Sequence, residues 1–151
     1  MAVKNKNLQF LESLLASIDM SKPELAHLME MSPQNIFTYF QRDDMRLSFA
    51  QRVADRLGYE LSFSLDMETP SPICIVEIEL PQGVDRLAFL RIALKKYGIT
   101  RKGLAEKLGL NYTGVNRWFR VDDISISYIF KIAELYDLKV KTTIKPKSSI
   151  S

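Results

Sequence analysis

The segment TRKGLAEKLGLNYTGVNRWF, residues 100–119, contains two short helical patterns separated by a turn. A segment of the same design, SKPELAHLMEMSPQNIFTYF, occupies residues 21–40. In this earlier copy Ser21 precedes a helical pattern and Glu24 follows three positions later, which is the arrangement of a capping box. The sequence therefore predicts that one pair of helices occurs twice in the chain.

The duplication extends well beyond these segments. A single constant offset, which places Leu8 on Leu87, aligns residues 8–65 with 87–144 without a gap. Eleven aligned positions are identical: Leu8/Leu87, Phe10/Phe89, Leu11/Leu90, Leu15/Leu94, Leu25/Leu104, Ala26/Ala105, Phe40/Phe119, Asp43/Asp122, Asp44/Asp123, Ser48/Ser127 and Ala54/Ala133. The alignment indicates a tandem repeat, and we refer below to the first copy and the second copy.

Each copy is expected to form four helices followed by one strand. In the first copy apolar residues at helical spacing predict helices over 8–18, 21–29, from Ser32 to about Phe40, and 47–57. In the second copy the corresponding helices are expected near 87–97, 100–108, 111–119 and 126–136. Alternating patterns then predict strands over 59–65 and 138–144.

A third alternating pattern lies between the copies, where Val76, Ile78 and Leu80 alternate with Glu77 and Glu79. Its acidic face could pair with the lysines of the last strand. We therefore expect one small antiparallel sheet that joins the two copies. The expected division is a first unit with its strand over 1–66, a linker containing a strand over 67–86, and a second unit with its strand over 87–151.

Composition excludes several classes of function. Cys74 is the only cysteine and His27 the only histidine, so neither an intrachain disulfide nor a Cys/His zinc site can form. The sequence contains no glycine-rich phosphate loop and no G-x-S-x-G nucleophile motif, and it has neither a signal peptide nor a long apolar run. We therefore expect a cytoplasmic, nucleoid-associated protein that is not an enzyme and uses no cofactor, no metal and no membrane.

The positive charge is concentrated in the second copy. The chain carries a net charge of +3, but residues 87–151 hold 13 Lys and Arg against 5 Asp and Glu. Residues 1–66 hold 7 against 9, and residues 67–86 hold 1 against 4. A polyanionic partner would therefore meet most of the favourable charge on the second copy.

The second copy resembles the lambda repressor-like (Cro/cI, XRE-type) helix-turn-helix family. The resemblance rests on TRKGLA at 100–105, LGLN at 108–111, Val115 and Trp118; in the first copy it rests on SKPELA at 21–26, MS at 31–32, Ile36 and Tyr39. It covers most of both copies and implies a mainly α fold of two tandem four-helix units. It also implies a sequence-specific transcriptional regulator that binds double-stranded DNA.

Family positions identify the residues expected to contact DNA. Base readers are implied at the start and middle of the third helix: Gln34, Asn35 and Thr38, with Pro33 beside them, and Tyr112, Thr113, Asn116 and Arg117. Gln34 can pair with adenine and Arg117 with guanine. Phosphate contacts are implied at the start of the second helix and in the loop after the third: Lys22, Arg42, Arg46, Arg101, Lys102 and Arg120.

Three other features concern the possible roles of the two copies in DNA binding. Gly114 is costly inside a helix, which suggests that DNA or another helix approaches closely there. The Asp43-Asp44 and Asp122-Asp123 pairs are interpreted as turn formers or caps leading to the fourth helix of each copy. The first copy departs further from the family, since Glu30 replaces the turn glycine and Phe37 is expected to be exposed.

Three functional hypotheses follow. In the first, both copies read DNA as a covalent pseudo-dimer with two major-groove segments about 34 Å apart. In the second, only one copy reads DNA and the first copy associates with itself or another protein, as in an antitoxin-like module; a homodimer through the strands or the first copy belongs to this case. In the third, the chain is a protein-interaction adaptor that does not bind DNA.

Overall fold

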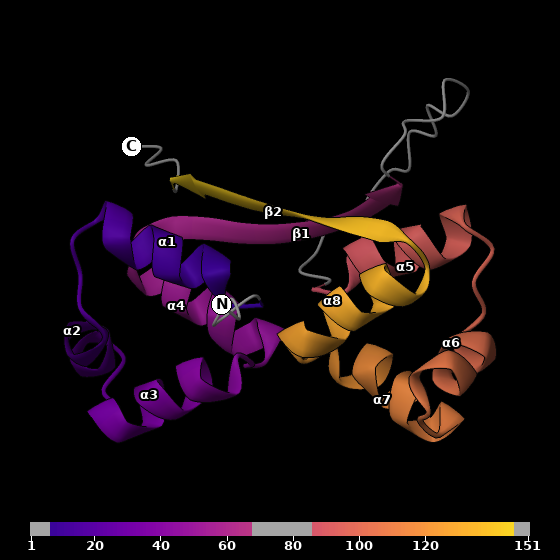
Figure 1. The fold of residues 1–151 in the computed structure, drawn as a ribbon, viewed down its shortest axis with the longest axis horizontal. Helices are drawn as coiled ribbons and strands as arrows, with labels where there is room; N and C mark the ends of the chain where they lie inside the picture. The colour runs from indigo at the N-terminus through magenta and orange to yellow at the C-terminus, as the bar shows by residue number, and fades with distance from the viewer. Residues whose placement is uncertain (1–6, 68–85, 147–151) are drawn as a thin grey trace, which may run out of the picture. The chain divides into compact units, whose positions relative to one another are not determined.

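The fold is that of a computed structural model, which describes residues 7–67 and 86–146. These residues form eight helices and two strands (Figure 1). In chain order they are α1 Gln9–Ser17, α2 Lys22–Leu28, α3 Pro33–Arg42, α4 Leu47–Arg56, β1 Tyr59–Met67, α5 Ala88–Lys96, α6 Arg101–Leu108, α7 Tyr112–Val121, α8 Ile126–Leu135 and β2 Leu138–Pro146. Each element from α5 onward begins at the position that the sequence alignment assigns to its counterpart in the first copy.

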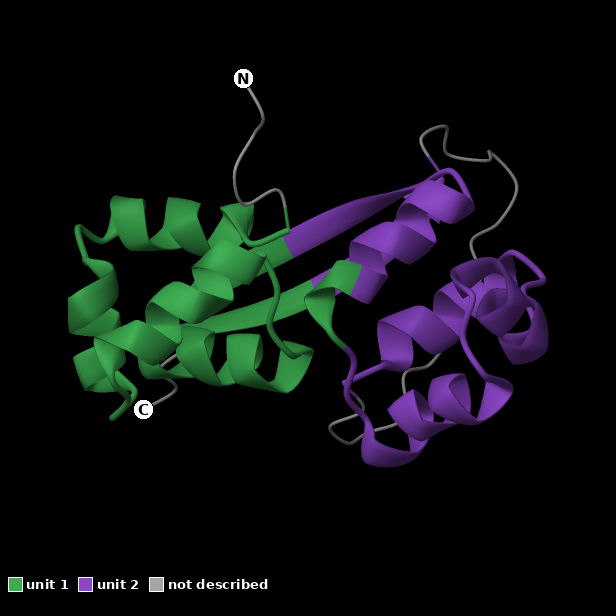
Figure 2. Cartoon of the chain, turned by 60° about the horizontal axis from the view of Figure 1, so that its bottom comes forward, with its two compact units in different colours: residues 1–62, 125–127, 143–151 green, residues 63–124, 128–142 purple. Residues whose placement is uncertain are grey.

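The chain divides into two compact units (Figure 2). Of the described residues, the first unit contains 7–62, 125–127 and 143–146. The second contains 63–67, 86–124 and 128–142. Each strand thus contributes residues to both units, as does the start of α8.

Polar caps begin the second and third helices. The predicted capping box is confirmed, since Ser21 Oγ accepts a hydrogen bond from the Glu24 backbone N–H and Glu24 Oε1 accepts one from the Ser21 N–H, both at 3.2 Å. Ser32 Oγ accepts from the Asn35 N–H at the start of α3. Each cap satisfies a backbone donor that the helix itself leaves unpaired.

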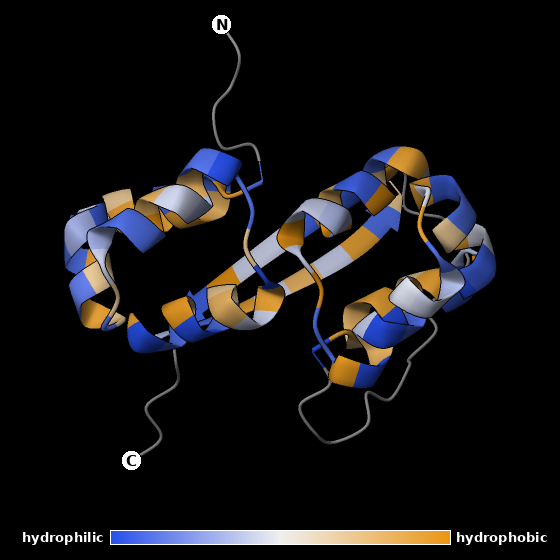
Figure 3. Cartoon of the chain, turned by 90° about the horizontal axis from the view of Figure 1, so that it is seen from below, coloured by the Kyte–Doolittle hydropathy of each residue, from blue (hydrophilic) through white to orange (hydrophobic). Residues whose placement is uncertain are grey.

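Within each unit the second helix packs on the third. Ala26 and Ala105 have exposed fractions of 0% and 2%, and their small side chains allow the two helices to cross closely. Ile36 and Val115 are equally buried on the facing helices. Apolar and polar residues accordingly occupy different sides of the helices (Figure 3). The crossing leaves the opposite sides of α3 and α7 available to a partner.

Two aromatic residues, one in the second half of each third helix, are not wholly in the core. Tyr39 and Trp118 are half-buried. Each ring packs against a ring of the following helix: Tyr39 stacks on Phe49 with centroids 4.9 Å apart, and Trp118 lies against Tyr128 at 5.1 Å. They therefore fix the third helix on the fourth through ring contacts.

β1 and β2 pair with each other in a two-stranded antiparallel sheet. In β1 the buried side chains Leu61, Phe63 and Leu65 alternate with more exposed ones, as predicted. The strand expected around Val76–Leu80, with Glu77 and Glu79, lies outside the described residues. The end of β1 is held on α5, because Asp66 Oδ1 accepts from Lys96 Nζ at 2.8 Å. This hydrogen bond raises the pKa of Lys96.

The Asp-Asp pairs form turns, but the first aspartate of each pair does not cap the fourth helix. Asp43 and Asp122 end α3 and α7 in the left-handed conformation, with φ of 54° and 55°. The Asp43 carboxylate accepts from the backbone N–H groups of Asn7 and Leu8, both at 2.9 Å. Of the two alternatives given by the sequence, the turn is confirmed for these two aspartates, and their carboxylates hold the chain where the first helix of each copy begins.

Asp44 does cap a fourth helix, but it is the one that belongs to the second copy. Its carboxylate accepts from the Ser127 N–H and from the Ser127 hydroxyl, both at 2.9 Å, within the first unit. The Met45 carbonyl also accepts from the Ile126 N–H at 2.8 Å. Segments from the two different copies are therefore joined inside this unit, which sequence periodicity does not reveal.

The ends of α2 and α6 differ in a way that stability measurements can detect. Gly109 ends α6 with φ 69°, whereas Glu30 adopts φ 57° at the matching position. Nothing lies within 4 Å of a Cβ added at Gly109, so only backbone strain opposes a side chain there. We expect Gly109→Ala to lower the free energy of unfolding by about 1 kcal/mol and Glu30→Gly to raise it by a similar amount. Urea unfolding measures both, and a stabilising Gly109→Ala would contradict the assignment.

Candidate nucleic-acid interface

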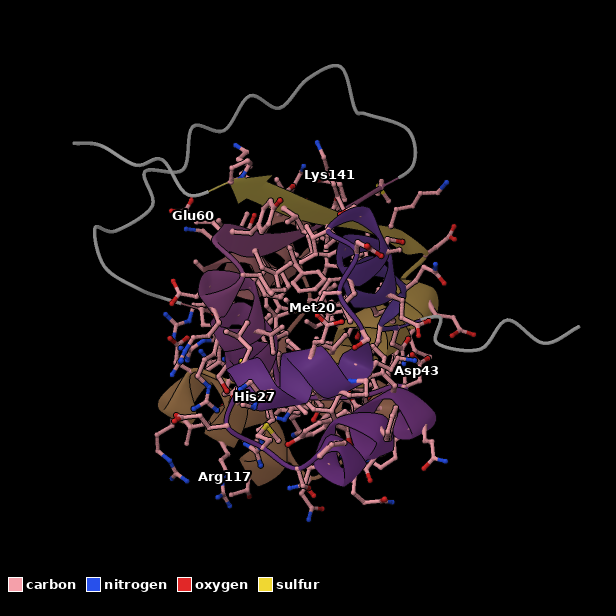
Figure 4. The ribbon with its side chains drawn as sticks, turned by 90° about the vertical axis from the view of Figure 1, so that its left-hand side faces the viewer. Met20, His27, Asp43, Glu60, Arg117 and Lys141 are labelled. Atoms are coloured by element: carbon pink, nitrogen blue, oxygen red, sulfur yellow. The ribbon has the colours of Figure 1, made fainter. Side chains whose placement is uncertain are left out.

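The outward side of α7 carries the polar residues predicted to read bases in the second copy. Tyr112, Thr113 and Arg117 are exposed, and Arg117 lies at the surface (Figure 4). Asn116 is half-buried. Val115 points into the core with no measurable exposure. The residues that face solvent are thus distinct from those that hold the helix in place.

The matching residues of α3 have fewer hydrogen-bonding groups free to contact a partner molecule. Gln34 and Asn35 are exposed. Thr38 is half-buried, and its hydroxyl donates to the Gln34 carbonyl at 2.9 Å, so its proton is already used within the helix. Phe37 is 41% exposed, as the sequence predicted. This face of α3 is consequently more apolar than that of α7.

The predicted phosphate-binding residues fall into two groups. Lys102 is exposed and Arg101 is half-buried at the start of α6, and Lys22 is half-buried at the start of α2. The structure corrects the position of the others: Arg42 and Arg120 lie in the last turn of α3 and α7, not in the loop that follows. The third helix is longer than expected because it ends only at the aspartates. The exposed Arg46 is the N-cap residue of α4.

Phe40 and Phe119, which align with each other, have different charged side chains around their rings. In the first unit the Lys22 Nζ lies 4.6 Å from the Phe40 ring centroid and forms an ion pair with Glu12 at 2.9 Å. In the second unit the Phe119 ring is approached by two guanidinium groups, with Arg101 at 4.0 Å and Arg91 at 5.4 Å. These two arrangements are described as the Phe40 cluster and the Phe119 cluster.

Sequence reasoning did not identify Glu12 and Arg91, although the alignment of the two copies places them at one position. The exchange replaces a carboxylate by a guanidinium at one site. The Phe40 cluster therefore has a cation and an anion, whereas the Phe119 cluster has two cations. An anion such as a phosphate group would be attracted more strongly to the second.

Arg101 also contacts α7. Its Nη1 donates a hydrogen bond to Asn116 Oδ1 at 3.1 Å while the guanidinium lies over the Phe119 ring. One side chain at the start of α6 is thus fixed against α7 by both a polar and a ring contact. The residues predicted separately as a phosphate ligand and a base reader are brought together.

Gly114 lies on the exposed side of α7 in open space. No atom of the described residues comes within 4 Å of a Cβ added there. Packing of another helix within the described chain, one of the two explanations raised by the sequence, is therefore not the reason for this glycine.

The arrangement of α6, a short turn and an exposed α7 is that of a helix-turn-helix. Residues 90–141 match the Helix-turn-helix family. This family, of the lambda repressor-like (XRE) type, comprises DNA-binding transcription regulators and is not one of enzymes. The helix-turn-helix match includes all of α6 and α7 and none of α1–α4.

No curated protein and no solved structure matches the chain. Across residues 7–67 and 86–146, none of the helices has the length and hydropathy needed to cross a membrane. The same ranges contain no cluster of three or more His, Cys, Asp or Glu side chains suited to a metal ion.

Proposed function

We propose that the chain is a sequence-specific transcriptional regulator that inserts α7 into the major groove of DNA. The observation that carries the proposal is the pairing, within the family match, of an exposed polar α7 face with the cations Arg101 and Lys102 at the start of α6. A helix of this size fits the major groove, where its outward side chains meet base edges. Cations at a helix N-terminus can bind the adjacent phosphate.

Gly114 supports this orientation of α7 and provides a direct test. Because a Cβ meets nothing within the described chain, Gly114→Ala should stabilise the fold by up to about 1 kcal/mol through better helix propensity. If DNA approaches this position, the same change should weaken specific binding at least about threefold. Thermal unfolding and titration with labelled DNA measure the two effects separately. A more stable variant with unchanged affinity would show that DNA does not approach there.

The tandem arrangement favours a covalent pseudo-dimer. We propose that the copies at 1–66 and 87–151, joined by 67–86, each present a third helix to one of two major-groove segments on the same DNA. The support is that the elements of both copies share one order and one constant offset along the chain. A chain that is monomeric in solution and protects two half-sites about one helical turn apart would support this use of both copies.

The Phe40 cluster provides a test of whether the first copy contacts DNA. Replacing Glu12 by glutamine removes the carboxylate that neutralises Lys22. If α3 contacts DNA, affinity should rise about two- to fivefold, and the slope of log K against log salt should become steeper by up to about 0.9, the value for one additional phosphate contact.

A matched control separates this local effect from the change in net charge. Glu60→Gln removes the same charge from an exposed residue of β1 in the first unit. It should leave the affinity and the salt slope almost unchanged, because screening weakens distant charges. Equal gains from both variants would mean that only the net charge of the chain matters.

A second candidate role for the first copy rests on Phe37. This apolar ring is 41% exposed on the outward face of α3, and in the same unit the charge of Lys22 is paired with that of Glu12. Aromatic side chains on such a face are typical of protein contacts. In this alternative α3 mediates association and only α7 reads DNA. A dimer that becomes monomeric in Phe37→Ser while each chain still protects one half-site would favour it.

The proposal as a whole is tested by selecting bound sites from random duplex DNA. We expect one recurring sequence and an affinity that falls steeply between low and moderate salt, because phosphate neutralisation releases counterions. The stoichiometry of the complex should be measured with the selected duplex. Absence of a recurring sequence, with equal weak binding to all duplexes, would overturn sequence-specific recognition and favour the protein-interaction adaptor.

A further inference from the structure

A single guanidinium group connects the start of α6 to the reading face of α7. Arg101 lies over the Phe119 ring at 4.0 Å and donates to Asn116 Oδ1 at 3.1 Å. Both Arg101 and Asn116 are half-buried, whereas Phe119 is buried. A planar guanidinium that lies on a ring has few orientations left, so the direction of its hydrogen bond to Asn116 is fixed before a ligand binds.

This contact determines which end of the Asn116 amide faces outward. A guanidinium has only donors, so it pairs with the amide oxygen and cannot pair with the amide nitrogen. Within residues 7–67 and 86–146 the Asn116 side chain makes no second hydrogen bond, and its NH₂ group keeps both donors. Asn116 therefore differs from a freely rotating asparagine, which can present either a donor or an acceptor.

We infer that Arg101 fixes the orientation of the Asn116 amide so that its NH₂ group is the part presented to a base, which favours bases with major-groove acceptors over cytosine. The inference rests on the proposed function. Arg101 uses one of the two lone pairs of the amide oxygen, so the amide cannot exchange its oxygen and nitrogen positions without losing this hydrogen bond. Guanine offers two acceptors, N7 and O6, adenine offers N7 and thymine offers O4, whereas the major-groove edge of cytosine offers a donor. Cytosine is therefore the base that Asn116 should reject.

The first test identifies the base that Asn116 contacts. Sites are selected from random DNA with the wild-type chain and with Asn116→Ala, and the position whose preference disappears in the variant is the one that Asn116 reads. We expect guanine, adenine or thymine there in the wild-type sites, with a loss of about two- to tenfold when cytosine is substituted. Cytosine at that position would overturn the inference, as would an Asn116→Ala variant that leaves every preference unchanged while the chain still binds DNA.

Asn116→Asp tests the donor directly. The carboxylate can still accept from Arg101 but has no proton to donate to a base. The preference at the same position should therefore shift toward cytosine, whose amino group can donate to it. Retention of the wild-type preference in Asn116→Asp would contradict a donor role.

Arg101→Met tests the orienting role, with Lys102→Met as the matched control. Both variants remove one cation from the start of α6, and methionine can keep the apolar contact with Phe119. Both should lower affinity for all sequences and reduce the salt slope by about 0.9. Only Arg101→Met should also relax the preference at the Asn116 position and let cytosine compete there, because the released amide can turn its oxygen toward the base.

The outcomes distinguish the inference from the function on which it rests. Equal effects of the two methionine variants, with base preference intact in both, would overturn the orienting role of Arg101 while DNA binding stands. Failure of the wild-type chain to select any sequence would remove the proposed function and the inference together. Circular dichroism and thermal unfolding of each variant check that the helices remain folded.

Discussion

Arg117→Ala is expected to lower the affinity for the selected DNA site about 10- to 100-fold, whereas Gln34→Ala should lower it less than about threefold. Arg117 is exposed on α7, in the copy that carries most of the positive charge. A bidentate contact of arginine with guanine accounts for about 1–3 kcal/mol of discrimination. Gln34 is exposed on α3, in the unit where Lys22 is paired with Glu12, so we expect its contact with DNA to contribute less.

The experiment is a binding titration against the selected duplex and a scrambled one at one salt concentration. Arg117→Ala should reduce binding to the selected duplex much more than to the scrambled duplex, because base contacts specify and phosphate contacts position. Arg117→Lys, which keeps the charge and loses the planar fork, should retain the salt slope but not the specificity. Equal losses in Arg117→Ala and Gln34→Ala would show that both copies read DNA to the same extent.

Most of the fold could be predicted from the sequence because its signals are local. Serine caps, proline in the first turn and apolar spacing identify α2 and α3, and the constant offset between the copies transfers them to α6 and α7. The ends of α3 and α7 were less predictable. They extend to Arg42 and Val121 because Asp43 and Asp122 adopt the left-handed conformation and bind backbone groups at the start of their own copy.

The candidate site was predicted only as a set of separate residues. Helical spacing identifies which side chains of α7 face outward, and the structure agrees for Thr113 and Arg117. The contact of Arg101 with Asn116 depends on the crossing of α6 and α7, which sequence spacing does not determine. The two electrostatic clusters were missed for a similar reason. Each cluster takes its members from three helices of its own unit, and Glu12 lies on α1 whereas Arg91 lies on α5.

Asp122→Ala should lower the free energy of unfolding by about 2–4 kcal/mol, and Asp43→Ala by a similar amount. The Asp122 carboxylate accepts from the Arg86 N–H at 2.8 Å and from the Leu87 N–H at 3.0 Å, both partly buried. A hydrogen bond to a charged group contributes about 1.5–3 kcal/mol, and removal of the acceptor leaves the backbone donors unpaired. For a chain of this size the melting temperature should fall by about 5–15 °C.

Three variants distinguish loss of the carboxylate from other effects. Glu134→Ala removes a carboxylate from an exposed position of α8 and should change the free energy of unfolding by less than about 0.5 kcal/mol. Asp122→Gly and Asp43→Gly remove the carboxylate but also the strain of the left-handed conformation. Their free energy of unfolding should therefore be higher than that of the alanine variants and still well below that of the wild type. A stabilising glycine variant would show that backbone strain outweighs the hydrogen bonds.

Because Asp43 and Asp122 make matching contacts, their variants should affect stability equally, whereas the DNA-binding effects of α3 and α7 should remain unequal. Equal effects on stability with unequal effects on DNA binding are the result expected if two similar units share one scaffold and only α7 reads DNA strongly.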